Sequence, residues 1–120
     1  MKYFNYSEFD SPDVQGSGQL MDKILLEMLD EVRDKFDKPI HITSGYRTPA
    51  HNEVVGGVET SSHLKGLAVD ISCNNSSDRF DLINCLLDVG FSRIGIANSF
   101  IHADIDFDKA QGVIWTYKWA

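Results

Sequence analysis

Two histidines and one aspartate have the residue types and the spacing of a metal site. His63 and Asp70 lie in the segment SSHLKGLAVD, and His102 lies in FIHADID. Two imidazoles and a carboxylate suit catalytic zinc, which takes three protein ligands and keeps a fourth position for water. Zinc held in this way lowers the pKa of the bound water to about 7 and polarises a scissile carbonyl. The three residues therefore predict one zinc ion and a hydrolytic reaction.

The patterns around these residues place Asp70 and His102 on strands. Apolar residues alternate at Leu67, Val69 and Ile71, which predicts a strand. The Asp70 carboxylate would lie on the face opposite these apolar side chains. A partly buried carboxylate needs a partner there, which a metal ion, an arginine or a hydrogen-bond network could supply. His102 and Asp104 are two positions apart on another predicted strand, so they share a face. The sequence contains no HExxH motif, which excludes the helical zincin arrangement.

The elements that would position these residues begin with two helices. Residues 17–36 carry an apolar stripe at helical spacing and predict a long helix that ends before Pro39. Residues 78–89 predict a second helix, which Gly90 closes. Shorter helical segments are expected at residues 7–10, with Ser7 as cap, and from Pro49, with Thr48 as cap, to Gly56.

The remaining segments predict a small sheet. Strands are expected at residues 39–43, 67–72, 93–97 and 100–105, and residues 113–119 are expected to form a last strand or an extended tail. Asn98-Ser99 has the composition of a hairpin turn. The element order predicts an α+β fold, with helices packed on a small, mostly antiparallel sheet. We expect a single domain over residues 1–120, with the motifs within about 39–106.

Charge and composition argue against several classes of partner. The formal net charge of −7 disfavours nucleic acid and anionic membrane surfaces. No apolar segment approaches the roughly 20 residues that span a bilayer, and no signal peptide is visible, so we expect a soluble chain made in the cytoplasm. Cys73 and Cys85 are too few for a disulfide framework. They are expected to be small buried thiols, although a bridge between them is possible.

Three segments resemble one peptidase family. SSHLKGLAVD matches the S-x-H-x-x-G-x-A-x-D signature of the zinc D-Ala-D-Ala carboxypeptidase group, the M15 type. Upstream, SGYRTPAHNEVVGG resembles the group's S-G-[YF]-R segment, and GIANSFIHADID downstream resembles its final ligand-bearing strand. The resemblance covers roughly residues 4–106. The group comprises D,D-carboxypeptidases, D,D-dipeptidases and phage endolysins that cut L-alanyl-D-glutamate bonds, and Hedgehog signalling domains share its fold and zinc ligands.

The resemblance implies roles for individual residues. His63, Asp70 and His102 would bind the zinc. Arg47 would hold a substrate carboxylate or carbonyl and stabilise the oxyanion, a role that suits a permanently charged, forked guanidinium. The alternative for Arg47 is a salt bridge to an acidic residue. Ser61 would donate a hydrogen bond to substrate or support the site, and its alternative is a loop cap.

The chain departs from the family pattern at the expected general base. Many members carry Glu or Asp three residues before the final histidine, where this chain has Ser99. The resemblance is closest to members with an H-x-D motif, which implies Asp104 as the replacement. Asp104 would either activate the zinc water or orient a zinc-binding histidine through its free ring nitrogen. We favour the role as base or proton shuttle. Asp106 is expected at a turn or facing solvent, His51 on the surface or behind the site, and His41 on a strand as a structural residue.

Two functions follow from these expectations. The first is a zinc-dependent peptidase that hydrolyses peptide bonds in peptidoglycan, as a D,D-carboxypeptidase or as an endopeptidase of the endolysin type. The second is a catalytically silent zinc module that binds cell-wall fragments or a protein partner. A structural domain without metal is a third, weaker alternative. The chain is expected to be a monomer that acts at the cell wall if it is of phage or prophage origin.

Overall fold

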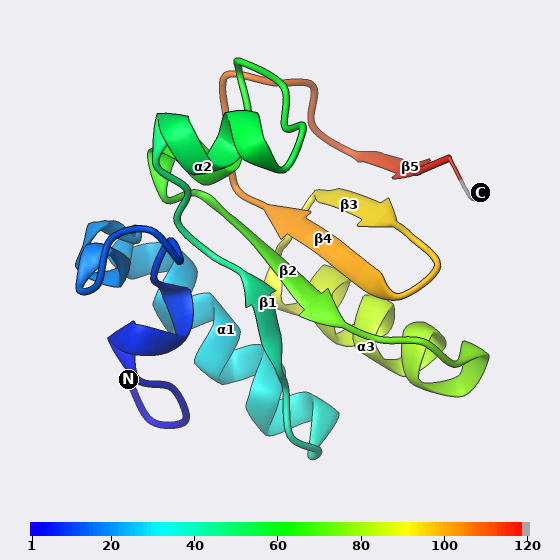
Figure 1. Ribbon diagram of the computed structural model, residues 1–120. Coiled ribbons are helices and arrows are strands. Elements are labelled where there is room, and N and C mark those ends of the chain that lie inside the picture. Colours follow the sequence, from blue (N-terminus) through cyan, green and yellow to red (C-terminus); the bar gives the residue numbers. More distant parts are fainter. Residues whose placement is uncertain (119–120) are drawn as a thin grey trace.

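The computed structural model describes residues 1–118, which form a five-stranded sheet with two helices packed on one face (Figure 1). The strands are β1 (Ile42–Ser44), β2 (Ala68–Ser72), β3 (Arg93–Ile96), β4 (Phe100–Asp104) and β5 (Val113–Thr116). Their order in the sheet is β1-β2-β4-β3-β5. Neighbouring strands are antiparallel except β3 and β5, which are parallel. The predicted α+β class with a mostly antiparallel sheet is confirmed.

The long first helix is shorter than the apolar pattern predicted. Helix α1 covers Lys23–Phe36, and a separate 3₁₀ turn, η2, covers Ser17–Leu20. Asp22 starts α1 because its side chain accepts hydrogen bonds from the backbone amides of Ile24 and Leu25. The backbone amide of Asp22 donates a hydrogen bond to the carbonyl of Gly66, outside the helix. The apolar stripe extends through this break because Met21 is buried as well.

The other helical segments follow the predictions more closely. Helix α2 (Pro49–Val54) has the predicted cap, since the Thr48 side chain accepts a hydrogen bond from His51. Helix α3 (Ser76–Val89) begins two residues earlier than expected because Asn75 caps it. At the N-terminus, the turn η1 (Tyr6–Phe9) is capped by Asn5 and not by Ser7. The polar loop expected after residue 60 contains a further 3₁₀ turn, η3 (Ser62–Lys65).

The strands also differ from prediction mainly at their ends. Strand β1 is displaced toward the C-terminus from the expected 39–43, where Pro39 has no amide proton to donate to a ladder. His41 lies just before β1 and is exposed, which does not fit the expected strand position. Strand β5 ends at Thr116, and Trp119, the end of the predicted last strand, lies outside the described residues.

The hydrophobic core lies between the sheet and the helices α1 and α3 (Figure 1). Leu25 and Leu29 of α1, Leu82 of α3 and Ile94 of β3 are fully buried there. The side chains of β2 that face this core are apolar, so Asp70 faces the other side of the sheet. Among residues 1–118, no helix is long and apolar enough to cross a membrane.

The two cysteines are free thiols. Cys73 is buried beside the core, as expected, whereas Cys85 is only partly buried. Burial raises the pKa of both thiols, which keeps them protonated and unreactive at neutral pH.

Candidate metal centre

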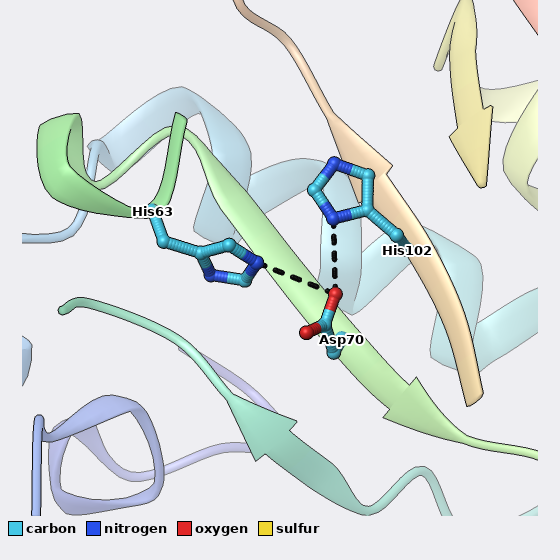
Figure 2. A group of neighbouring side chains, drawn as sticks. All are labelled: His63, Asp70 and His102. Carbon is cyan, nitrogen blue, oxygen red and sulfur yellow. Dashed lines mark hydrogen bonds and ion pairs between the residues drawn. The ribbon is translucent and has the colours of Figure 1, made fainter. Parts of the chain in front are cut away.

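Three buried side chains from three elements converge on the open face of the sheet (Figure 2). His63 comes from η3, Asp70 from β2 and His102 from β4. Asp70 and His102 are directly opposite each other in the antiparallel pairing of β2 and β4, which brings their side chains together. One donor atom from each residue lies within 4.8 Å of the other two. The three residues predicted as zinc ligands are therefore brought together.

The ring orientation of His63 leaves a lone pair facing the site. Its Nδ1 atom lies 2.7 Å from the carbonyl oxygen of Gly45, which can only accept, so Nδ1 carries the proton. The Nε2 atom is then unprotonated, is buried, and has no hydrogen-bond partner among the described residues. It lies 3.3 Å from Oδ1 of Asp70, which is also an acceptor.

His102 presents its other nitrogen to the same oxygen. Its Nε2 atom lies 2.7 Å from Oδ2 of Asp104, and its Nδ1 atom lies 3.0 Å from Oδ1 of Asp70. A neutral ring that donates Nε2–H to Asp104 therefore has its Nδ1 lone pair directed at Asp70. Burial lowers the pKa of His102, but the hydrogen bonds to the carboxylates of Asp104 and Asp70 raise it by more.

These atoms fit a cation. Two imidazole nitrogens and one carboxylate oxygen converge in a buried space, and three converging acceptors repel one another unless positive charge lies between them. Burial raises the pKa of the Asp70 carboxyl, but the hydrogen bond with His102 and the two neighbouring imidazoles outweigh burial and hold that pKa well below its usual range. Asp70 is therefore ionised at neutral pH. The unpartnered His63 Nε2 is the atom that a metal ion would satisfy.

Arg47 lies beside the ligand carboxylate. Its Nη2 atom is 3.3 Å from Oδ2 of Asp70, so the salt bridge considered as an alternative is present. The same guanidinium donates to Ser44 Oγ and Asn52 Oδ1 at 3.1 and 3.3 Å. Arg47 also lines the cleft above the site, so contact with substrate stays a prediction alongside the ion pair.

Ser61 has the loop-cap geometry considered as its alternative. Its Oγ accepts a hydrogen bond from the backbone amide of His63 at 3.3 Å and caps η3. It thereby helps to hold the ligand-bearing turn. Because Ser61 also lines the cleft, a substrate hydrogen bond stays a prediction.

The carboxylate of Asp104 is surrounded by donors. Besides His102 at Oδ2, its Oδ1 accepts from Arg93 Nε at 2.7 Å and from the Asp106 amide at 3.1 Å. Burial raises the pKa of the Asp104 carboxyl, but the hydrogen bonds from His102 and from the Asp106 backbone outweigh it and lower the pKa overall. This is the geometry of a group that orients a histidine. A role as base would require Asp104 to release one of these partners.

Three polar residues near the predicted motifs lie away from the candidate metal ligands. Of the two expectations for Asp106, exposure to solvent is wrong, because its side chain is 1% exposed and accepts hydrogen bonds from Ser62 and Lys65. A turn position fits, because the backbone amide of Lys109 donates to the carbonyl of Asp106. Ser99 lies exposed in the turn between β3 and β4. His51 is half-buried on α2, and neither it nor Ser99 lines the cleft.

A cleft of about 580 Å³ opens above the three ligands. One side is formed by the segment that follows α2, including Gly57 and Val58, and the other by residues of the sheet and of the β4–β5 connection. The lining residues that were not identified from the sequence include Arg93, Lys109, Trp115 and Tyr117. The cleft is large enough to admit a short peptide segment to the ligands.

The position of Arg93 could have been predicted from the sequence. A two-residue turn at Asn98-Ser99 places Arg93 opposite Asp104, which is the observed register of β3 and β4. The positions of Trp115 and Tyr117 could not be predicted from the sequence in this way, because β5 joins the sheet by parallel pairing after a long connection. Trp115 packs over Gly95, where an added Cβ atom would lie 2.8 Å from the indole. Its ring centroid is 5.4 Å from that of His102.

The chain matches a known family over most of its length. A family model described as Peptidase M15 matches residues 2–104, which include all three candidate ligands and Asp104. No curated protein matches the chain significantly.

Proposed function

The chain belongs to the M15 peptidase family, and on this premise we propose that it is a zinc-dependent peptidase that hydrolyses peptide bonds in peptidoglycan. The observation that carries the proposal is the buried His63 Nε2 atom, which lacks a partner and points at the Asp70 carboxylate. That atom, the Nδ1 of His102 and the ionised Asp70 form a three-ligand set of the catalytic zinc type. The cleft leaves room for a ligand beside them.

His63, Asp70 and His102 would hold the metal. When bound, zinc supplies a Lewis acid that polarises a substrate carbonyl and lowers the pKa of water. In each histidine the ring nitrogen that faces away from the site is held by a hydrogen bond. The carbonyl of Gly45 accepts from Nδ1 of His63, and Asp104 accepts from Nε2 of His102. Such supporting hydrogen bonds set the tautomer and make the ligand nitrogens better donors to metal.

In the resting site Asp104 would position His102, and to act as base or proton shuttle it would have to release one of its hydrogen-bond partners. Its oxygens already accept from His102, Arg93 and the Asp106 amide, and these bonds keep the carboxylate in place behind the ring. Arg47 is the group best placed to contact a substrate carbonyl or carboxylate, because it lines the cleft next to Asp70. Its permanent charge also suits stabilisation of an oxyanion.

The proposed substrate class agrees with the chemistry of the cleft. Stem peptides of peptidoglycan are short and rich in carboxylates, and the cleft presents the cations Arg47, Arg93 and Lys109. Trp115 and Tyr117 add an aromatic wall on which a peptide backbone or a small side chain can pack. Both a D,D-carboxypeptidase and an endopeptidase would find complementary groups here.

The test is digestion of purified peptidoglycan by the zinc-loaded protein, with mass spectrometry of the products. We expect new amino termini, and their identity distinguishes the two classes: free D-alanine indicates a carboxypeptidase, and cleaved stem peptides or cross-links indicate an endopeptidase. His63→Ala should abolish release, whereas His51→Ala should retain it, because His51 lies outside the cleft. No release at any pH, with zinc shown to be bound by elemental analysis, would contradict the proposal.

A second candidate function rests on the hydrogen bonds that both oxygens of Asp104 already accept. If none of its hydrogen bonds is released, the chain has a metal site without a carboxylate free to act as base, since Ser99 lies in the exposed hairpin turn. The chain would then be a zinc module that binds wall peptides without cleaving them. Binding of wall fragments without new amino termini in the same digestion would favour this function.

A further inference from the structure

We propose that Lys109, which Ser62 holds in place, and Arg93 form a subsite for a carboxylate of the bound peptide, separate from the group held at the metal centre. This inference deepens the proposed function and depends on it, because it names the substrate feature that the cleft selects. The subsite distinguishes a peptide with a free carboxylate near the cleaved bond from the same peptide with a carboxamide there.

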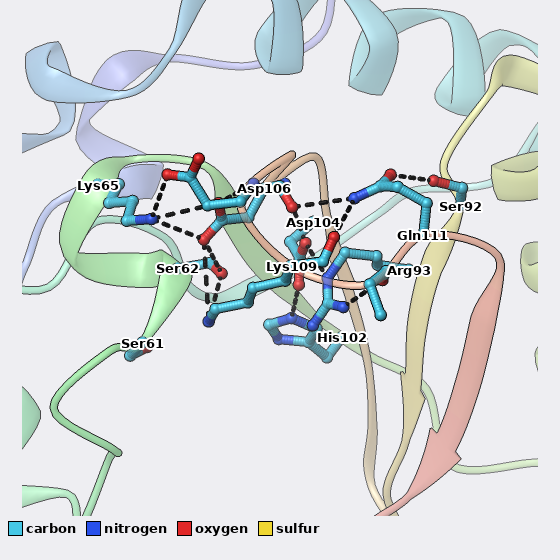
Figure 3. Close-up of polar contacts among 12 residues, drawn as sticks. Ser61, Ser62, Lys65, Ser92, Arg93, His102, Asp104, Asp106, Lys109 and Gln111 are labelled. Carbon is cyan, nitrogen blue, oxygen red and sulfur yellow. Dashed lines mark hydrogen bonds and ion pairs between the residues drawn. The ribbon is translucent and has the colours of Figure 1, made fainter.

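Lys109 is held at the cleft by neutral groups. It lies in the connection between β4 and β5, and its Nζ atom is 2.7 Å from the carbonyl oxygen of Thr60. The same atom is 2.9 Å from Ser62 Oγ (Figure 3). These contacts with neutral groups fix the ammonium group at the cleft without neutralising its charge. The side chain is 27% exposed and lines the cleft, so the ammonium group is accessible to a ligand.

The nearest carboxylate compensates Lys109 only in part. Asp106 Oδ2 lies 3.8 Å from Lys109 Nζ, beyond hydrogen-bond distance. The same oxygen accepts from Ser62 at 2.7 Å and from Lys65 at 3.1 Å, so its charge is already shared. Asp106 is thus shared by the two lysines, and Lys65, which also pairs with the exposed Asp108 at 3.2 Å, is its closer partner. The longer contact leaves the Lys109 ammonium only partly compensated on the side of the cleft.

Arg93 adds a second cation to this side of the cleft. Its Nε atom pairs with Asp104 at 2.7 Å, its Nη1 atom donates to the carbonyl of Ala110, and its guanidinium lies over the Trp115 ring. Asp104 also accepts a hydrogen bond from His102, so its negative charge is shared between Arg93 and His102. Arg93 is therefore rigidly placed and incompletely neutralised.

The charge of the cleft contrasts with that of the whole chain. Among the described lining residues, Arg47, Arg93 and Lys109 outnumber the carboxylates Asp70 and Asp104, whereas the chain carries a formal charge of −7. A divalent metal on Asp70 would increase the excess of positive charge. A low-dielectric cleft concentrates such a field, so the site favours an anionic ligand in an otherwise acidic protein. A carboxylate suits the combination of an ammonium and a guanidinium, since hydrogen bonds between charged partners are the strong ones.

The experiment measures binding to the metal-free protein, so that it does not depend on catalysis. The probes are the tripeptide L-alanyl-γ-D-glutamyl-L-lysine and its counterpart with the D-glutamate α-carboxyl converted to carboxamide, titrated at low salt by NMR. We expect the wild type to bind the carboxylate form about tenfold more tightly, as for one charge-assisted contact worth about 1.4 kcal/mol. Lys109→Gln should remove this preference, and Lys109→Arg should retain it.

Lys38→Gln is the control. Lys38 is paired with Asp78 and does not line the cleft, so the preference for the carboxylate should remain in this variant. Equal binding of the two peptides by the wild type, or an unchanged preference in Lys109→Gln, would overturn the subsite. A retained preference without hydrolysis of wall peptides by the zinc-loaded protein would instead reject the peptidase proposal and leave the subsite standing.

Discussion

The Nε2 atom of His102 lies 2.7 Å from Oδ2 of Asp104, and this contact decides which ring nitrogen faces the metal site. Because Asp104 accepts the Nε2 proton, Nδ1 is directed at Asp70. Asp104 is itself held by Arg93 from the neighbouring strand β3. The orientation of one ligand thus depends on a chain of polar contacts across β4 and β3.

The positioning role of Asp104 predicts a loss of metal affinity. Asp104→Asn should weaken zinc binding about 10- to 100-fold, because carboxylates behind a metal-binding histidine contribute to affinity on this scale. Competition with a chromophoric chelator measures the change. Asp108→Asn is the control, since Asp108 is 87% exposed and does not line the cleft.

The alternative role of Asp104 predicts a different pattern. A general base contributes about 10²- to 10⁴-fold to the rate. If zinc affinity is unchanged in Asp104→Asn while kcat falls by that amount, Asp104 acts as the base and the positioning role is wrong.

Zinc should stabilise the folded protein through His63. At a free zinc concentration about 100 times Kd, binding to the native state alone adds about 2.7 kcal/mol, which raises Tm by several degrees for a chain of this size. Differential scanning fluorimetry with and without a chelator measures the shift. His63→Ala should lose most of it and His51→Ala should keep it. An equal shift in both variants would place the metal elsewhere.

Asn52 is expected to support both Arg47 and the segment after α2. Its side chain is buried, accepts from Arg47 Nη1 and donates to the carbonyl of Val58 at 2.9 Å. Asn52→Ala should lower the free energy of unfolding by about 1–3 kcal/mol, because it removes a buried side chain with its two hydrogen bonds. Urea denaturation measures the loss. Asn84→Ala removes a similar side-chain bond on an exposed part of α3 and should change stability by less than about 0.5 kcal/mol.

The buried Asp106 should make stability depend on pH in the acid range. Burial raises the pKa of this carboxyl, but hydrogen bonds from Ser62 and Lys65 outweigh it, so the pKa is lowered overall. A lowered folded-state pKa stabilises the protein above the unfolded pKa near 3.8, and this contribution is lost as the pH falls through the folded-state value.

The corresponding variant tests the sign of this dependence. Asp106→Asn should be less stable than the wild type at pH 7, and the difference should shrink as the pH falls below about 4. Urea denaturation at several pH values between 2.5 and 7 measures the difference. A gap between the two proteins that widens toward low pH would contradict the assignment, and Asp108→Asn should show little dependence because its carboxylate is exposed.

Local sequence patterns were sufficient to predict the candidate metal ligands and the strands that carry two of them. The alternation around Asp70 and the hairpin turn at Asn98-Ser99 predicted strands, and strands place side chains by a simple two-residue period. The motif spacing around His63 and Asp70 then identified the ligand set that the structure brings together. These features depend on contacts within a strand or between adjacent elements, which short segments determine.

Tertiary structure alone decided the surroundings of the ligands. The start of α1 depends on the Asp22 cap, and the apolar stripe continues past it, so periodicity did not reveal the break. Asp106 looked exposed because its partners Ser62 and Lys65 are 44 and 41 residues away in the chain. The parallel pairing of β5 with β3 brings Trp115 to the cleft after a long connection. Contacts between distant segments depend on how the whole core packs, and no local period encodes them.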